Sequence, residues 1–264
     1  MKVLTPITFI LIFLFYSCQK VVTLKLNTIP PQIVIQGEVT DSAGPYSITI
    51  NQTVDFYADN VFPPVSGAIV KISDDEGYTD SLTEFSPGIY STHGLQGKAG
   101  HTYTLSVFAQ NTNYSAVSTM PMPVKLDSVT LEITSGFGMQ RINAIVNFQD
   151  PPGIANYYQF QEYINGQLFN KEIFIFDDRL SDGKYISATL RTDSSYLKSG
   201  DQLKVNMFSI DQNVYNYFLQ LRQSSGTGAF NSTASPANPT SNISGGALGY
   251  FSAHTTQSQI ITVY

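Results

Sequence analysis

Residues 102–109 read TYTLSVFA, and polar and apolar side chains alternate along this segment. Every second residue from Tyr103 to Ala109 is apolar, and the residues between them from Thr102 to Ser106 are polar. Successive side chains of a strand point to opposite faces of a sheet, so this period of two predicts a strand with one buried face. Residues 46–51 repeat the pattern. Short strands of this kind, separated by turns, are typical of a β-sandwich.

A pair of prolines divides the chain into two expected domains. Met120-Pro121-Met122-Pro123 cannot lie inside a sheet, because proline lacks the N–H group of a ladder hydrogen bond. Strand patterns resume after this segment, and Asn165-Gly166 suits a two-residue hairpin turn between two of them. We therefore expect one β-sandwich over residues 32–120 and a second over residues 124–264.

One segment of the second domain has a helical period. Asp211 can cap a helix near residues 211–223. Val214, Phe218 and Leu221 then fall on one face, so we expect this helix to pack on the second sheet. The expected fold class is all-β, with two β-sandwich domains of immunoglobulin-like or transthyretin-like type and one short packing helix in the second.

The last part of the chain is expected to close the second sandwich. Residues 247–253 and 260–264 predict two further strands. Before them, Gly245-Gly246 and Gly249 have a spacing that suits either tight backbone packing or a binding loop, and no strand-to-helix signal accompanies it. We favour backbone packing over a binding loop.

Residues 1–18 have the features of an export signal. Lys2 precedes a run from Ile7 to Tyr16 that is apolar apart from Thr8. This run is too short to cross a bilayer as a helix, since that takes about 20 residues. Ser17-Cys18 stands where cleavage would fall, which resembles a bacterial lipoprotein signal whose cysteine is acylated. We expect a lipidated Cys18 followed by a tether over residues 19–31. An ordinary signal peptide with an incidental cysteine is the alternative.

The composition limits the partners of the protein. Its net charge of -6 and pI near 4.9 oppose binding to nucleic acid, which needs a phosphate-neutralising surface. They equally oppose attachment to anionic lipid through a basic patch. Cys18 is the single cysteine, which excludes an intrachain disulfide. Membrane attachment is therefore expected through N-terminal acyl chains, at about 0.8 kcal/mol per buried methylene.

Four motifs of the first domain occur in order, namely Ile35-Gln36-Gly37-Glu38-Val39, Val65-Ser66-Gly67-Ala68-Ile69-Val70, Gly88-Ile89-Tyr90 and Gly100-His101-Thr102-Tyr103-Thr104-Leu105. They resemble the transthyretin-like or carboxypeptidase-regulatory β-sandwich, in which a Gly-Ala-x-Val strand and a Gly-x-Tyr strand recur. This resemblance implies a sandwich fold for the first domain and carries no activity with it.

Later motifs are Asp127-Ser128-Val129, Phe148-Gln149-Asp150-Pro151, Asn156-Tyr157-Tyr158, Phe176-Asp177-Asp178, Gly200-Asp201, Asn238-Pro239 and the run from Asn242 to Phe251. Together with the first set they resemble a lipoprotein family, domain of unknown function 4249, over residues 33–253. Its members occur in one phylum of Gram-negative bacteria and are often encoded beside TonB-dependent outer-membrane receptors. The resemblance implies a location and a candidate receptor partner, but no mechanism.

The sequence offers few residues for catalysis or metal binding. His93, His101 and His254 are far apart and do not form a metal-spaced pair. Asp177-Asp178 with Asp182 suggests a calcium loop, because that ion prefers oxygen ligands, but the spacing does not alternate as such loops do. We favour an acidic turn over a calcium site. We expect no catalytic residues, no metal and no cofactor.

The loop between two expected strands of the first domain is the strongest candidate for ligand contact. Phe56, Tyr57 and Phe62 bring aromatic rings together with Asp55 and Asp59, a composition that suits a sugar or a peptide. The alternative is a loop that folds back on its own sandwich and binds nothing.

We expect a non-enzymatic lipoprotein of the outer membrane that acts as a binding or accessory module and partners a TonB-dependent receptor in nutrient uptake. A structural or adhesive cell-surface protein is the alternative. A hydrolase would require Asp177, Asp178 or a histidine to meet a nucleophile in a deep pocket. Gln19-Lys20 resembles the start of a surface-export signal, but no acidic residue follows before Glu38. Surface display is therefore only narrowly preferred over a periplasmic position.

Overall fold

The computed structural model describes residues 30–55, 58–136, 139–190, 197–224 and 237–264. In the first half, the strands are β1 Ile33–Thr40, β2 Ser47–Gln52, β3 Ile69–Asp74, β4 Thr79–Ser81, β5 Thr83–Ser86, β6 Ile89–Ser91, β7 Thr102–Ala109 and β8 Thr112–Thr119. In the second half they are β9 Leu126–Gly136, β10 Met139–Gln149, β11 Tyr157–Ile164, β12 Gln167–Asp177, β13 Tyr185–Leu190, β14 Gln202–Ile210 and β15 Leu248–Thr262. One helix, α2, spans Gln212–Ser224.

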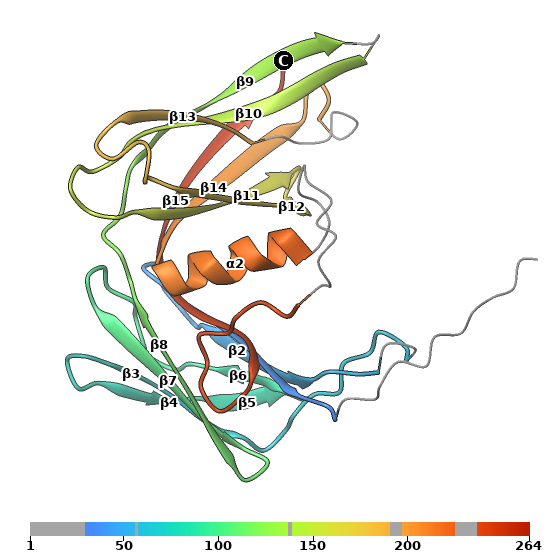
Figure 1. Cartoon of the computed structure of the whole chain (residues 1–264), viewed down its shortest axis with the longest axis vertical. Helices are drawn as coiled ribbons and strands as arrows, with labels where there is room; N and C mark the ends of the chain where they lie inside the picture. The colour runs from blue at the N-terminus through green and yellow to red at the C-terminus, as the bar shows by residue number, and fades with distance from the viewer. Residues whose placement is uncertain (1–29, 56–57, 137–138, 191–196, 225–236) are drawn as a thin grey trace, which may run out of the picture. The chain divides into compact units, whose positions relative to one another are not determined.

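These strands form three sheets. One has eight strands in the order β12-β11-β14-β15-β1-β2-β6-β5, one has four in the order β4-β3-β7-β8, and one has three in the order β13-β10-β9. The four-stranded sheet covers the β15-to-β5 half of the eight-stranded sheet, which we call the first sandwich (Figure 1). The three-stranded sheet covers the other half, the second sandwich. The all-β sandwich fold expected from the alternating strands is therefore confirmed.

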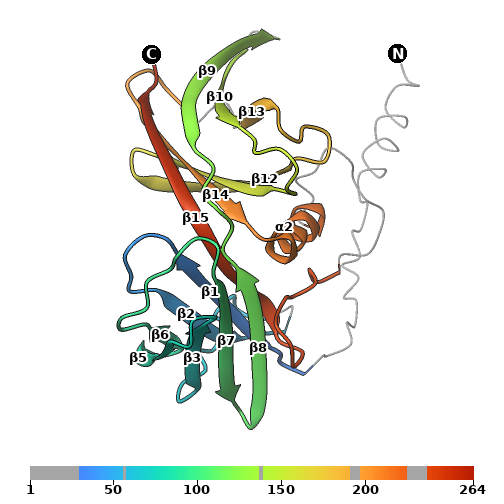
Figure 2. The same ribbon diagram turned by 90° about the vertical axis from the view of Figure 1, so that its left-hand side faces the viewer.

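Strand β15 belongs to both sandwiches. Its residues Leu248–His254 pair in parallel with β1, from Val34 opposite Leu248 to Thr40 opposite His254. Its residues Thr255–Thr262 pair antiparallel with β14. Figure 2 shows this strand running from one sandwich into the other. The two closing strands expected from the sequence are thus one continuous strand, whose partner changes between His254 and Thr255.

The core of the first sandwich includes side chains from the far end of the chain. Its fully buried residues include Ile35 and Ile48 of the eight-stranded sheet and Leu105 of the four-stranded sheet. Ile243, Ala247, Phe251 and Ala253 complete it. The sequence places these last four in the expected second domain, but they belong to the first core. Phe251 and Ala253 reach it through the parallel pairing of β15 with β1, and Ile243 forms a bridge with Ala116 of β8. The division of the chain at Pro121–Pro123 stays a prediction.

Glycines permit this close packing. Gly249 has φ +95°, and a Cβ placed on it would lie 2.0 Å from the carbonyl oxygen of Ile35 on β1. Gly245 has φ +84°, and its Cβ would lie 2.6 Å from the carbonyl oxygen of Asn113. Only a residue without a side chain fits both constraints. The expectation of tight backbone packing is confirmed at Gly245 and Gly249, whereas Gly246 has open space around its Cβ position.

The second core lies between the three-stranded sheet and β11 and β14. Phe148 and Tyr158 are its largest fully buried aromatic residues, and their rings pack edge to face with centroids 4.9 Å apart. At the far end of the β11–β12 hairpin, Asn165 (φ 50°) and Gly166 (φ 80°) form the two-residue turn that the sequence predicts. The second core takes Val263 from the end of the chain.

Helix α2 covers the outer face of the second sandwich's part of the eight-stranded sheet. Val214 and Phe218 are buried, and they pack with Tyr157 and Phe208 of the sheet. The Asp211 carboxylate accepts a hydrogen bond from the Val214 N–H at 2.9 Å, which is the N-cap expected from the sequence. Within the part of the chain that the structure describes, no helix has the length and apolar character to cross a bilayer.

Candidate functional site

A polar groove of about 330 Å³ lies on the face of β1 and β2 that is turned away from the first core. The polar side chains that line it are Gln36, Glu38, Thr40, Ser47, Thr49 and Tyr250. On β1 they alternate with the core residues Ile35 and Val39, so the period that buries one face exposes this one. Gln36 lies opposite both Thr49 and Tyr250 in the sheet. Three strands therefore contribute to this β1–β2 groove.

Tyr250 forms the wall between the β1–β2 groove and helix α2. Its ring packs against Tyr217 and Phe218 of α2, with centroid separations of 5.1 and 5.0 Å. Its hydroxyl donates a hydrogen bond of 2.9 Å to the Glu38 carboxylate. Burial raises the pKa of Tyr250, and the charge of Glu38 raises it further, so the phenol stays protonated. The aromatic packing holds the phenol in place, and the phenol holds one carboxylate oxygen of Glu38.

The β1–β2 groove has a negative charge. Glu38 is the single formal charge among its lining residues, and none of the ion pairs formed by the described residues includes it. His254 lies near it under the helix, with Nδ1 3.0 Å from the Ser252 hydroxyl. Burial lowers the pKa of His254, against the opposing charges of Glu38 and Asp41, so the imidazole is neutral at pH 7. It does not neutralise Glu38.

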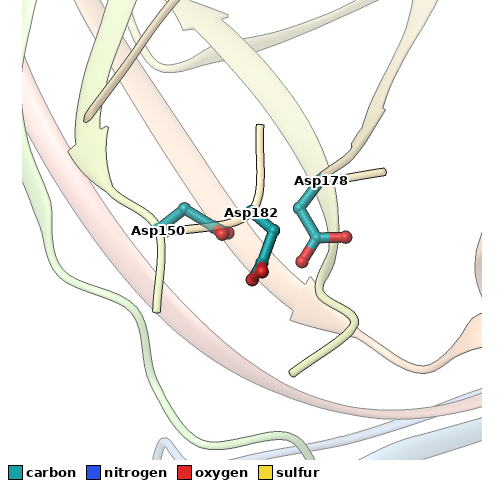
Figure 3. Close-up of side chains that lie close together, drawn as sticks. All are labelled: Asp150, Asp178 and Asp182. Atoms are coloured by element: carbon teal, nitrogen blue, oxygen red, sulfur yellow. The ribbon is translucent and has the colours of Figure 1, made fainter. Parts of the chain in front are cut away.

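Three aspartates from two connections meet beside the second core (Figure 3). Asp150 follows β10, Asp178 follows β12, and Asp182 lies in the turn before β13. One carboxylate oxygen of each lies within 4.8 Å of those of the other two, and Asp150 and Asp178 are buried. Oxygen ligands at such separations are a donor set that calcium can take. The sequence analysis missed Asp150, because its segment reads as a break between strands.

Each of these three carboxylates accepts a hydrogen bond from the protein itself. The donors are Tyr158 O–H and Gly183 N–H for Asp150, Asn156 N–H for Asp178, and Gly153 N–H for Asp182, at 2.5 to 3.0 Å. These bonds join the connection after β10 to the connection after β12. Burial, and next the neighbouring Asp150 carboxylate, raise the pKa of Tyr158, so its hydroxyl remains a donor. The contacts fit an acidic turn, and the expectation of no metal site stays a prediction.

Asp177 is turned away from this cluster. Its carboxylate accepts hydrogen bonds from the Arg179 guanidinium at 2.9 Å and from the Tyr215 hydroxyl at 2.6 Å. The bond from Arg179 lowers the pKa of Asp177, and burial with the bond to Asp177 raises the pKa of Tyr215 to about 12. Asp177 therefore anchors helix α2 to the end of β12 and leaves Asp178 to the turn.

A carboxylate, an imidazole and a hydroxyl form a chain in the first sandwich. Asp80 Oδ1 lies 3.2 Å from His93 Nδ1, and His93 Nε2 lies 3.0 Å from the Thr83 hydroxyl. This order of groups is that of a hydrolase triad. The His93 side chain is 59% exposed, whereas that of Asp80 is 3% exposed. A neighbouring cavity of about 230 Å³ is lined by His93 but not by Thr83.

The backbone donors that could support such a triad are taken by Asp80. The N–H groups of His93, Gly94 and Leu95 all donate to Asp80 Oδ2, at 2.9 to 3.0 Å. Burial opposes ionisation of Asp80, but these bonds together hold its pKa below the usual value. An acyl-transfer site needs such N–H groups aimed at a developing oxyanion. Here they donate to the carboxylate of Asp80, so the constellation holds the connection after β6 in place.

The site residues expected from the sequence are only partly described. Cys18, Phe56 and Tyr57 lie outside the described residues. Phe62 is described and is 52% exposed, beside Val61, which is 73% exposed. The contribution of this loop to ligand contact stays a prediction. Sequence reasoning missed the β1–β2 groove, because Gln36 and Thr49 read as the ordinary polar face of a strand.

The fold and the groove define an all-β protein of two β-sandwiches that share a strand and carry a polar groove beside it. The chain belongs to the family described as domain of unknown function (DUF4249), whose model matches residues 19–260. Membership of the family expected from the sequence motifs is therefore confirmed, and the lipoprotein character expected with it stays a prediction. No curated protein matches the chain in sequence.

Two solved structures are similar over long stretches, at low identity. A two-domain fibronectin type-III segment of chicken tenascin is 11% identical over 88% of this chain and 99% of that one, with a TM-score of 0.24. The adhesin InvE of Yersinia pseudotuberculosis is 16% identical over 67% of this chain and 55% of that one, with a TM-score of 0.23. Neither likeness contributes to the functional argument below.

Proposed function

We propose that this protein is a lipoprotein, anchored in the outer membrane through acylated Cys18, and that it acts as a non-enzymatic binding or accessory module. The observation that carries the binding role is the β1–β2 groove, in which hydrogen-bonding groups from three strands converge beside a tyrosine held by α2. The signal-like segment ending at Cys18 supports the anchor.

The proposed partner is a TonB-dependent outer-membrane receptor, and the proposed role is in nutrient uptake. The support is the family, since its members are often encoded beside such receptors. Co-purification tests the partnership: the tagged protein is isolated from solubilised outer membrane, and the proteins that accompany it are identified. We expect a barrel receptor among them. Its absence under conditions that retain other outer-membrane complexes would contradict the accessory role.

The anchor is tested by Cys18→Ser, with Ser17→Ala as the matched control that retains the cysteine. We expect Cys18→Ser to lose its acyl chains and leave the membrane fraction, while its circular dichroism matches that of the wild type, because the core residues that the structure describes begin at Ile33. Ser17→Ala should remain acylated. A Cys18→Ser protein that still carries acyl chains and sediments with membranes would contradict the anchor.

The non-enzymatic role is tested at the Asp80–His93–Thr83 constellation, whose order of groups resembles an active site. We expect purified protein to hydrolyse activated esters such as p-nitrophenyl acetate no faster than its Thr83→Val and His93→Ala variants do, because the backbone N–H groups beside them bind Asp80. A rate that falls at least about tenfold in both variants, with unchanged folding, would contradict the non-enzymatic role.

Orientation at the outer membrane is part of the proposal, with surface display preferred over a periplasmic position. Proteinase treatment of intact cells tests this preference. Digestion of the protein on intact cells supports surface display, and full protection until the outer membrane is permeabilised contradicts it.

A structural or adhesive surface protein is the second candidate. The observation that favours it is β15, which is hydrogen-bonded into both sandwiches and therefore couples them as a spacer would require. A deletion strain separates the two candidates. Normal nutrient uptake with altered attachment favours the structural role, and impaired uptake with normal attachment favours the binding role.

A further inference from the structure

The hydrogen-bonding groups of the β1–β2 groove are of mixed character. Gln36 offers both an amide donor and a carbonyl acceptor, and Thr40, Ser47 and Thr49 offer hydroxyls that donate and accept. The Glu38 carboxylate only accepts. A ligand that satisfies this set must itself both donate and accept at several points on its surface.

The charge of the β1–β2 groove excludes anionic ligands. Glu38 is its single formal charge, and no lysine or arginine lines it. An anion placed there would be repelled by Glu38 and would find no cation to replace its lost hydration. Phosphorylated compounds, carboxylic acids and nucleic acids are therefore poor candidates for this site.

A cationic amine is also a weaker match than a neutral polyhydroxylated compound. An ammonium group only donates hydrogen bonds, so it would leave the donors of Gln36 and Thr49 without a partner. Glu38 Oε1 already accepts one hydrogen bond from Tyr250, which leaves Oε2 and the second lone pair of Oε1 to receive a ligand. Vicinal hydroxyls, in contrast, can donate to Glu38 while neighbouring hydroxyls accept from Gln36 and Thr49.

We propose that the β1–β2 groove binds a neutral saccharide, with Glu38 and Thr49 as direct contacts to its hydroxyls and Tyr250 as the residue that positions Glu38. A volume of about 330 Å³ is at the small end of ligand sites, which suits a mono- or disaccharide or the end of a longer glycan. This inference rests on the proposed function in that it names the ligand of the binding module.

Calorimetric titration of the complete mature protein tests the proposal. The probes are glucose, mannose, galactose and N-acetylglucosamine with maltose, cellobiose and lactose, and the charged comparisons are galacturonic acid and spermidine. We expect at least one neutral sugar to bind, and neither charged probe to bind as tightly. Glu38→Ala should weaken the neutral sugar at least about tenfold, because it removes the charged acceptor.

Two further variants separate a direct contact from a general effect. Thr49→Val keeps the shape of the side chain and removes its hydroxyl, and it should also weaken binding. Glu132→Ala removes an exposed carboxylate from β9 in the second sandwich and should leave sugar binding unchanged. Tyr250→Phe should weaken binding less than Glu38→Ala does, since it frees Glu38 without removing it.

The outcomes that overturn the saccharide proposal are definite. The proposal is overturned if no neutral sugar binds at millimolar concentration. It is also overturned if spermidine or galacturonic acid binds more tightly than every neutral sugar. A sugar affinity that Glu38→Ala and Thr49→Val leave unchanged also places the ligand elsewhere. If a receptor co-purifies with the protein but the protein binds no sugar, the saccharide proposal is contradicted and the proposed function is not.

Discussion

The two sandwiches complete their cores in different ways. The second core is built almost entirely from residues between Val124 and Met207, and from the end of the chain it takes Val263, with Ile261 of β15 partly buried against it. The first core is built from residues 33–120 and is then completed by residues from the other end, which are Ile243, Ala247, Phe251 and Ala253. Strand β15 takes part in both sandwiches, because its first half pairs with β1 and its second half pairs with β14.

From this difference we infer that the stability of the first sandwich depends on the second. Its parallel β1–β15 pair joins residues more than 200 positions apart in sequence, for example Gln36 with Tyr250. Closing so long a loop is costly in chain entropy, and non-local pairs form late in folding. If β14 holds the later part of β15 in place, it also presents the earlier part to β1. We therefore expect the two sandwiches to unfold as one cooperative unit.

The largest expected effect is that of Gly249→Val, which breaks the shared strand at the first sandwich. A valine there combines a left-handed φ of +95° with a Cβ at 2.0 Å from the Ile35 carbonyl oxygen, so β1 and β15 cannot remain paired. We expect hydrogen–deuterium exchange to show loss of protection along β1 and β2 and, because the two sandwiches unfold together, along β11 and β14 as well. The control is Gly246→Ala, which has φ +82° and open space around its Cβ, and should lose only about 1 kcal/mol.

Protection of β1 that survives Gly249→Val would contradict the parallel pairing. A loss confined to β1, with β14 and β11 still as protected as in the wild type, would keep the pairing but show that the sandwiches unfold separately.

The next effect compares the two cores directly. Phe251→Ala opens the first core and Phe148→Ala opens the second, and both phenylalanines are fully buried. Each should lower the free energy of unfolding by about 3–5 kcal/mol. Because β15 belongs to both sheets, we expect a single urea transition in both variants, seen alike by tyrosine fluorescence and circular dichroism. Two separate transitions, of which each variant moves only one, would contradict the coupling.

A smaller effect concerns the stability of the first sandwich at low pH. Backbone donors hold the pKa of buried Asp80 below its usual value, so its ionised form stabilises the fold at neutral pH. That stability is present above the unfolded pKa of about 3.9 and is lost as the pH falls through the folded pKa. We expect Asp80→Asn to cost about 1–3 kcal/mol at pH 7 and less towards pH 3, measured by urea titration. An equal cost at both pH values would contradict this role.

Asp211 in the second half should show the opposite dependence. Burial raises its pKa, although the Ser118 hydroxyl and the Val214 N–H donate to it. A raised pKa means a contribution that is full below the unfolded pKa and declines as the pH rises through the folded pKa. We expect the wild type to lose stability relative to Asp211→Asn between about pH 4 and pH 7. A gain over that range would show that the hydrogen bonds outweigh burial.

The smallest effect is expected from calcium at the second sandwich. Asp150, Asp178 and Asp182 already accept hydrogen bonds from the protein, so we expect millimolar calcium or its removal by EDTA to leave the melting temperature unchanged. An ion bound at a hundred times its Kd would add about 2.7 kcal/mol. A rise in melting temperature that Asp182→Asn abolishes would show a cation site and contradict this expectation.

The sequence was sufficient for features that depend on neighbouring residues. Alternation identified the strands, Asn165-Gly166 identified a hairpin turn, and Asp211 identified the start of the helix, because each of these signals is local. The sequence did not identify the strand with which residues 247–253 pair. Alternation shows which face of a strand is buried but not against which strand, so a parallel pair across the whole chain leaves no local mark.

The candidate groove was hidden for a related reason. Gln36, Glu38 and Thr49 appear in sequence as solvent-facing positions, and only the pairing of β1 with both β2 and β15 places them around one space. Asp150 likewise reads as part of a turn, and its approach to Asp178 depends on how two connections fold together. Sites assembled across strands need the topology before they can be recognised.

The shared strand is tested most directly by nuclear Overhauser contacts in the deuterated, amide-protonated protein. We predict contacts between the backbone amides of β1 around Gly37 and those of β15 around Phe251, and in the same sample contacts between Met207 and Gln257 across β14 and β15. Observation of both sets establishes that one strand serves two sandwiches. Contacts at Met207 and Gln257 with none between β1 and β15 would contradict it.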